Sequence, residues 1–116
     1  MKFSDMKYIR PDLEKLKTEL AGINEEIINA ESASVAALAY KKAEKLNEAY
    51  SSMGSLCYIR HTINTKDEFY EEENNFFDEN GPIVSDLLNK INRSLLESMQ
   101  LWHLSFQKKF SAKNVR

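Results

Sequence analysis

Apolar residues recur along this chain at the spacing of an α-helix, in four stretches separated by short polar breaks. In the first stretch the intervals are three, four, three and four residues: Leu13, Leu16, Leu20, Ile23 and Ile27. This spacing places the five side chains on one face of a helix about 18–20 residues long. The second stretch follows the polar break at residues 29–34 and predicts a helix to about residue 63, with Val35, Leu38, Leu46, Ala49, Tyr50, Met53, Leu56, Cys57 and Ile63.

The third and fourth stretches are predicted as separate helices. Thr65 and Glu68 have the spacing of a capping box, which opens a helix that carries Phe69, Tyr70, Phe76 and Phe77. Gly81 is expected to end this helix in a left-handed conformation, and Pro82 to occupy the first turn of the next. The fourth helix has helical spacing of its apolar positions: Val84, Leu87, Leu88, Ile91, Leu95 and Leu96.

The two ends of the chain are expected to be less regular. Residues 1–10 are predicted to be irregular because a residue before proline, here Arg10, favours extended geometry, and Pro11 fits a first helical position. Beyond Ser98 a helix is expected to about Phe110, with fraying after it. The predicted fold class is therefore all-α: an antiparallel helical bundle or hairpin array of four main helices plus a partly helical C-terminal tail. Residues 1–98 are expected to form one helical domain and residues 99–116 an apolar, then basic, tail.

Composition narrows the function classes. A net charge of −2 argues against nucleic-acid binding through a basic surface. The single cysteine, Cys57, cannot form an internal disulfide, and the polar start offers no signal peptide, so a cytoplasmic location is expected. No stretch has the roughly 20 apolar residues of a membrane span. We expect neither a membrane nor a nucleic-acid partner.

The two histidines, His61 and His103, exclude the usual helical zinc and di-iron sites. A helical zinc peptidase site requires H-E-x-x-H, and neither histidine is followed by glutamate. A di-iron bundle requires Glu-x-x-His, but Tyr58 and Gln100 occupy the glutamate positions. The sequence predicts no catalytic, metal-binding or cofactor-binding residue in this chain.

Cys57 and His61 are four residues apart and share one face of the second helix. This leaves open a two-ligand metal contact or a Cys–His nucleophile pair. Two ligands are too few for a structural zinc, and no donors for an oxyanion can be placed near the pair. The alternative of a packed thiol and a hydrogen-bonded imidazole is favoured.

Glu73 differs from the other carboxylates between Asp67 and Glu79 because it lies within the row of aromatic residues on the third helix. A half-buried carboxylate requires a cationic partner, and Arg60 or His61 on the preceding helix is predicted to supply it. A structural ion pair is favoured over a functional role. At the C-terminus, Lys108, Lys109, Lys113 and Arg116 are interpreted as a solvated basic end, with contact to an anionic surface as the alternative.

A family resemblance rests on the run from Ile59 to Tyr70, then Glu73-Asn74, Phe76-Phe77-Asp78-Glu79 and Gly81-Pro82. Together with the opening Met1–Met6 and Arg10–Leu13, this run resembles the oligoendopeptidase F-like branch of the thimet oligopeptidase family over about residues 1–98. The resemblance implies an all-helical amino-terminal region that forms one wall of a channel for short peptides. In the complete enzymes a later catalytic region supplies the zinc ligands and the general base, so no catalytic residue carries over to this chain.

Two functions follow as hypotheses. The first is a non-catalytic amino-terminal fragment or remnant of an oligoendopeptidase, truncated before the catalytic region, without zinc of its own. It implies apolar surface that is covered by self-association or by a separate catalytic region. The second is a free-standing helical module that uses the aromatic third helix or the apolar tail to bind a partner helix.

Overall fold

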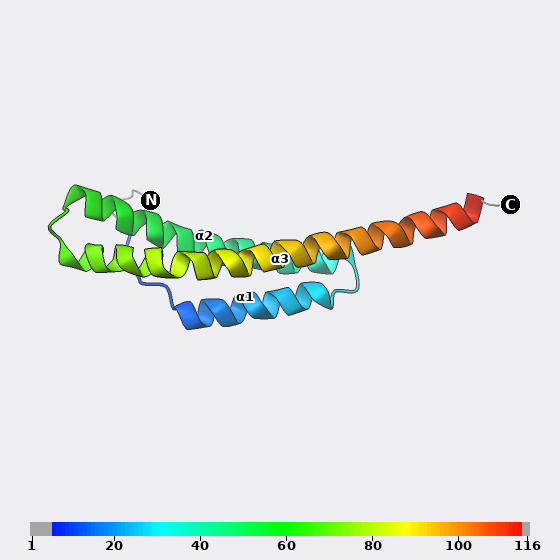
Figure 1. Cartoon of the computed structure of the whole chain (residues 1–116), viewed down its shortest axis with the longest axis horizontal. Coiled ribbons are helices and arrows are strands. Elements are labelled where there is room, and N and C mark those ends of the chain that lie inside the picture. The colour runs from blue at the N-terminus through cyan, green and yellow to red at the C-terminus, as the bar shows by residue number, and fades with distance from the viewer. Residues whose placement is uncertain (1–5, 115–116) are drawn as a thin grey trace.

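The computed structural model describes residues 6–114, with side chains through Leu101. It contains three helices: α1 (Leu13–Ile28), α2 (Ala33–Ile63) and α3 (Glu68–Asn114). Within residues 6–114 there is no strand, so the all-α class is confirmed. Helices α2 and α3 form an antiparallel hairpin, and α1 lies along part of it (Figure 1).

Short polar side chains fix where α1 and α2 begin. The Asp12 carboxylate accepts a hydrogen bond from the Lys15 N–H at 3.1 Å, and the Ser32 hydroxyl accepts one from the Val35 N–H at 3.3 Å. Both satisfy backbone donors that the first helical turn leaves free. The predicted break before α2 is therefore confirmed, whereas Pro11 precedes the cap of α1 and is not its first helical residue.

The predicted cap of the third helix is wrong. Thr65 does not cap α3; the Asp67 carboxylate accepts the hydrogen bond from the Phe69 N–H at 2.9 Å. A turn precedes this cap, because the Asn64 side chain accepts from the Lys66 N–H and the Asn64 carbonyl from the Asp67 N–H, each at 3.2 Å. The turn shifts the start of the helix towards the C-terminus, to Glu68.

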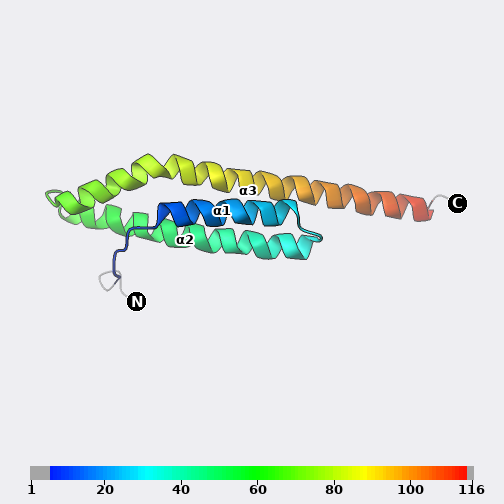
Figure 2. The same cartoon turned by 90° about the horizontal axis from the view of Figure 1, so that it is seen from below.

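The third and fourth predicted helices are one continuous helix, which corrects the expected number from four to three in residues 6–114. No glycine of this part of the chain has a positive φ, so Gly81 does not end a helix. Pro82 lies inside α3 and removes one backbone donor. The helix persists because Phe77 before the proline packs on Tyr50 of α2, and Val84 after it is buried in the core. Figure 2 shows α3 changing direction along its yellow-green part.

Small side chains on α2 allow the three helices to pack closely. Ala36, Ala39 and Ala43 are at most 2% exposed. They form one core with apolar residues of the other two helices: Leu16, Leu20, Ile23 and Ile27 of α1, and Val84 and Ile91 of α3. The predicted apolar face of the first helix is thus confirmed. Because alanine is short, its partners approach the α2 backbone with little space left between them.

A second element covers the part of the hairpin that lies beyond α1. Residues 6–12, called the N-terminal arm below, have no regular secondary structure and run across α2 and α3. The Ile9 N–H lies 3.4 Å from the Met53 sulfur, and the Arg60 guanidinium donates to the Met6 carbonyl. The arm and α1 therefore cover successive parts of the same hairpin.

At the other end, α3 extends beyond α1 and α2, and the molecule is 75 Å long (Figure 1). Its backbone is helical to Asn114, past the predicted end at Phe110. The basic residues predicted to form a solvated end, Lys108, Lys109, Lys113 and Arg116, lie outside the residues with described side chains, as does His103. In the portion that the structure describes, no helix is both long and apolar enough to cross a lipid bilayer.

Two helical glycines provide a test of this packing. A Cβ added at Gly22 meets nothing within 4 Å, whereas one added at Gly54 lies 3.3 Å from the Phe77 ring. We expect Gly22→Ala to raise the free energy of unfolding by about 1 kcal/mol, since alanine loses less backbone entropy in a helix. Gly54→Ala should gain less or lose stability, because the Phe77 ring must shift. Urea denaturation of both variants measures this; equal gains would contradict the described α2–α3 contact.

Candidate functional site

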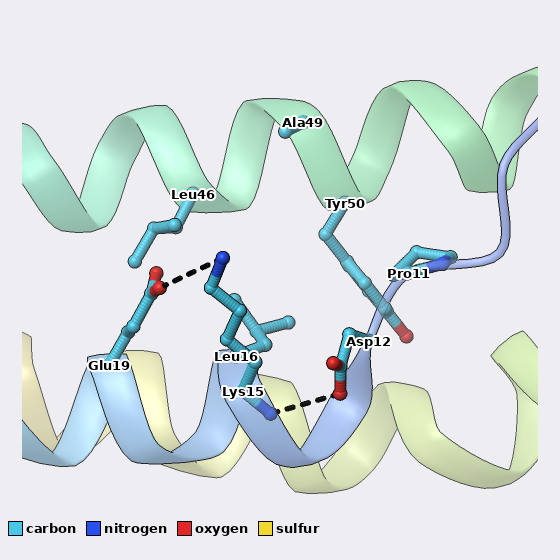
Figure 3. A pocket seen from close by; sticks show the side chains of 8 residues that line it. All are labelled: Pro11, Asp12, Lys15, Leu16, Glu19, Leu46, Ala49 and Tyr50. Atoms are coloured by element: carbon cyan, nitrogen blue, oxygen red, sulfur yellow. Dashed lines mark hydrogen bonds and ion pairs between the residues drawn. The ribbon is translucent and has the colours of Figure 1, made fainter.

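The first candidate site is a shallow groove between α1 and α2 with a volume of about 280 Å³ (Figure 3). Its floor is mainly apolar and its rim carries the ion pair between Lys15 and Glu19, at 3.9 Å. The residues that line it are Pro11, Asp12, Lys15, Leu16, Glu19, Leu46, Ala49 and Tyr50. This set contains no cysteine, histidine or serine, so it has no Ser–His or Cys–His pair.

Tyr50 is the one polar group that points from α2 into this region (Figure 3). Its hydroxyl is buried and has no hydrogen-bond partner among the described residues, and burial raises the pKa of the phenol. The ring packs on Phe77 with a centroid distance of 5.3 Å. A phenol held neutral in this way is a packing element that also lines the groove, and it supplies no charge for binding or catalysis.

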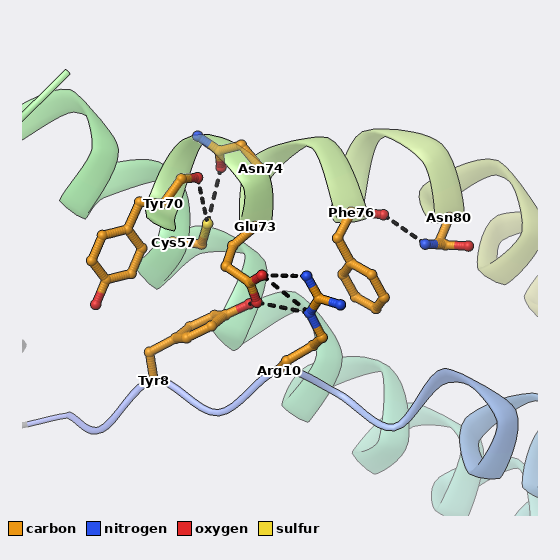
Figure 4. A network of polar contacts seen from close by, with 8 residues as sticks. All are labelled: Tyr8, Arg10, Cys57, Tyr70, Glu73, Asn74, Phe76 and Asn80. Carbon is orange, nitrogen blue, oxygen red and sulfur yellow. Dashed lines mark hydrogen bonds and ion pairs between the residues drawn. The ribbon is translucent and has the colours of Figure 1, made fainter. Parts of the chain in front are cut away.

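The second candidate site is a polar cluster between the arm and the hairpin, centred on Glu73 (Figure 4). The Glu73 side chain is 4% exposed. Arg10 Nε donates to both carboxylate oxygens, at 2.9 and 3.1 Å, and Arg10 Nη2 donates to Oε2. The Tyr8 hydroxyl donates to Oε1 at 2.7 Å. One buried carboxylate therefore receives hydrogen bonds from two residues of the arm.

Aromatic rings surround this cluster. The Arg10 guanidinium carbon lies 4.6 Å from the centre of the Phe76 ring, a cation–π contact. The Tyr8 ring meets Phe69 and Tyr70 edge to face, with centroid distances of 6.0 and 5.8 Å. Burial and the hydrogen bond to Glu73 raise the pKa of Tyr8, so the phenol stays neutral. Glu73 is buried but the side chain of Arg10 is 52% exposed, so solvent partly screens the ion pair.

The partner predicted for Glu73 is wrong, although its burial and ion pairing are confirmed. Arg60 donates instead to the Tyr70 hydroxyl at 3.0 Å and to the Met6 carbonyl. The cation that binds Glu73 is Arg10 of the arm, 63 residues away in the sequence. The reason is geometric. The Glu73 carboxylate faces the arm, whereas the Arg60 guanidinium is already bound to the Tyr70 hydroxyl and the Met6 carbonyl.

Cys57 is a packed thiol, the alternative that the sequence favours. It is fully buried, and its sulfur lies 3.2 Å from the Asn74 side-chain oxygen and 3.5 Å from the Tyr70 carbonyl. Burial, with a smaller contribution from the charge of Glu73, raises the pKa of the Cys57 thiol to about 11. A protonated thiol is neither a nucleophile nor a metal ligand at neutral pH. The Cys57–His61 pair therefore lacks the chemistry of a Cys–His dyad.

The zinc of the resembling enzymes does not fit this part of the chain. Across the residues that the structure describes, no group of three or more His, Cys, Asp or Glu side chains is placed to hold a metal ion. A catalytic zinc has three protein ligands. Glu73 is also unsuited to act as a general base, because the hydrogen bonds from Arg10 hold its pKa below the usual range and both of its oxygens are occupied.

Sequence reasoning missed Tyr8 and Arg10 as members of this cluster. The available signal was weak: an aromatic and a cationic residue, two positions apart, in an extended segment before Pro11. In extended backbone, side chains two residues apart point to the same side. Both can therefore reach one carboxylate. The long sequence separation from Glu73 left no local pattern that would identify the pair.

The fold and the cluster define an all-helical domain in which a buried carboxylate joins the N-terminal arm to the helical hairpin. The sequence pattern of the peptidase M3 N-terminal domain matches residues 3–112, and the chain belongs to this family. It is also similar to an X-ray structure, solved at 3.1 Å, of a protein provisionally assigned as oligoendopeptidase F. The match has a TM-score of 0.83 and 41% sequence identity, and it covers 90% of this chain and 18% of that one. No curated protein matches the sequence.

The ion pair of Glu73 predicts a large difference between neighbouring carboxylates. Glu73→Ala should lower the free energy of unfolding by about 2 kcal/mol, because it removes charged hydrogen bonds from Arg10 and Tyr8. Glu72→Ala, at an exposed position beside it, should change stability by less than about 0.5 kcal/mol. Thermal and urea denaturation of both variants measures the difference. Equal effects of the two substitutions would show that the Glu73 cluster contributes nothing to the free energy of unfolding.

The same ion pair predicts acid sensitivity. The hydrogen bonds from Arg10 lower the pKa of Glu73 in the folded chain, whereas the unfolded carboxyl titrates at its ordinary value, about 4.3. The stabilisation is therefore complete above that ordinary pKa and is lost as the pH falls through the lower folded pKa. The stability difference between the parent chain and Glu73→Gln should be constant near neutral pH and shrink in acid. Urea denaturation at a series of pH values measures it; a difference independent of pH contradicts the assignment.

Proposed function

We propose that this chain is a non-catalytic helical wall of an oligoendopeptidase, in which a separate catalytic region supplies the zinc and hydrolyses short peptides. One observation carries the proposal: a chain of the peptidase M3 N-terminal domain family has no three-ligand metal group in its described residues. Glu73, the most buried charge among the residues with described side chains, is already paired with Arg10. In this proposal the chain contributes shape and rigidity, and the chemistry takes place elsewhere.

The comparison with the solved structure supports this division. The chain spans about a fifth of the length of the oligoendopeptidase F that it matches, so most of that protein lies outside the similarity. The exposed apolar side chains of this chain suit contact with further protein; Leu38, Ile63 and Leu101 are 64–80% exposed. The unpaired Cys57 is consistent with a cytoplasmic location.

The exposed apolar side chains also favour a second candidate, a free-standing helical module that binds a partner helix. Its docking surface would be the aromatic part of α3, where Phe69 is 53% exposed, or the apolar segment after Ser98, where Leu101 is 67% exposed. The neighbouring genes distinguish the candidates. An adjacent reading frame that encodes H-E-x-x-H favours the peptidase wall, and an unrelated neighbourhood favours the module.

Metal and peptidase assays test the first candidate. We expect the purified chain to bind less than one equivalent of zinc in equilibrium dialysis and to leave fluorogenic peptides intact, because a hydrolytic zinc requires three protein ligands. The His61→Ala variant is the matched control, since any weak zinc binding that it abolishes is a surface contact. Peptide cleavage that a chelator stops would overturn the proposal.

A further inference from the structure

The N-terminal arm crosses the hairpin at the position of Cys57. On α2 the arm has two contacts. The Ile9 N–H lies 3.4 Å from the Met53 sulfur, and the Arg60 guanidinium donates to the Met6 carbonyl. Cys57 comes four residues after Met53 and three before Arg60, so these three residues share one face of the helix. The face of α2 that carries the thiol is therefore the face that the arm covers (Figure 4).

Helix α3 closes the other side of the thiol. The Cys57 sulfur lies 3.5 Å from the Tyr70 carbonyl and 3.2 Å from the Asn74 side-chain oxygen. Burial raises the pKa of both the Tyr8 phenol and the Cys57 thiol, and the charge of Glu73 adds to both shifts, so the three groups lie close together. Cys57 is fully buried, yet the molecule measures only 18 Å along its shortest axis. A single covering segment therefore separates the thiol from water.

The arm is not part of the helical framework. Within the described chain, no backbone–backbone hydrogen bond joins residues 6–11 to α2 or α3. The hydrophobic core consists of residues of the three helices, and no residue of the arm belongs to it. A segment with few buried apolar contacts and no backbone hydrogen bonds to its neighbours opens at a lower free energy than the whole domain. Release of the arm is therefore a local transition.

Side-chain contacts to Glu73 hold the arm in place. Arg10 and Tyr8 donate hydrogen bonds to its two carboxylate oxygens. The Arg10 guanidinium carbon also lies 4.6 Å from the centre of the Phe76 ring. Because the side chain of Arg10 is 52% exposed, solvent screens part of this attraction. The arm is thus held by a few side-chain contacts, which one substitution can weaken.

We propose that the N-terminal arm is a strap that opens while α1, α2 and α3 stay folded, and that its opening exposes the thiol of Cys57. In the closed state the thiol is buried and keeps its proton at neutral pH. In the open state it meets water and gains the reactivity of an ordinary cysteine, since the thiolate is the reactive form. The contact between Arg10 and Glu73 then controls chemical access to the only cysteine of the chain.

The rate of thiol modification tests the strap. The chain has one cysteine, so the protein reports on the opening without an added probe. The neutral aromatic disulfide dithiodipyridine exchanges with a thiolate and releases a coloured thiopyridone, which absorbance follows. We expect Arg10→Ala to raise the rate of labelling about tenfold, because it removes the charged hydrogen bonds to Glu73. Lys7→Ala, at an exposed position of the same arm, should leave the rate unchanged.

Urea separates the opening of the arm from the unfolding of the chain. A local opening exposes little surface, so the labelling rate below the unfolding transition should depend only weakly on urea, whereas labelling through global unfolding rises steeply. Ile23→Val, in the core between the helices, is the matched control for global stability. It should lower the urea midpoint of unfolding and leave the labelling rate without urea unchanged.

Two results contradict the strap. If labelling of the parent chain follows global unfolding at every urea concentration, the arm does not open separately. If Arg10→Ala labels at the rate of the parent chain, the contact with Glu73 does not control access to the thiol. Neither readout depends on peptidase activity, so failure here leaves the proposed function untouched.

Discussion

The requirement of one buried carboxylate for a cation determines the path of the N-terminal arm. Glu73 is almost completely removed from water, on a helix whose neighbouring carboxylates are exposed. The charged hydrogen bonds to Glu73 and the aromatic contacts of Tyr8 and Arg10 together offset the entropy lost when this short segment is ordered. Arg10 and Tyr8 satisfy both oxygens, and with them the arm lies across α2 and α3, over a part of the hairpin that α1 does not reach. The hydrogen bonds to this one carboxylate thus complement the apolar core shared by the three helices.

The fold was predictable where a local pattern and the tertiary packing agree. The apolar face of α1 and the polar break before α2 follow from spacing and capping alone, and the structure contains both. The break expected at Gly81-Pro82 is absent because the two sides of the proline, at Phe77 and Val84, both pack into the bundle. One missing hydrogen bond weighs less than this burial. Residues such as Gly81 and Pro82 raise the free energy of continuing a helix, and tertiary contacts decide whether the helix continues.

The site was predictable only in part, for a related reason. Glu73 stood out because its position in the aromatic row of α3 implied burial, and burial implied a cation. The choice of cation was wrong because it rested on proximity in sequence, whereas Arg10 approaches from an irregular segment with no periodicity to read. For Cys57, in contrast, the prediction of a packed thiol is confirmed. Its packed state follows from its helical position among apolar residues, and its hydrogen bond to Asn74 is a detail that only the structure supplies.

The contacts around Glu73 also affect the chemistry of the residues beside it. Glu73, Cys57 and His61 lie on two neighbouring helices, and their side chains are of types that bind metal ions. Arg10 binds the Glu73 carboxylate and lowers its pKa. Burial raises the pKa of the Cys57 thiol to about 11. Hydrogen bonds from the arm occupy both oxygens of the carboxylate, and the thiol keeps its proton at neutral pH, which makes it a poor metal ligand. The interactions that hold the arm and the hairpin together therefore also limit the reactivity of the Glu73 carboxylate and the Cys57 thiol.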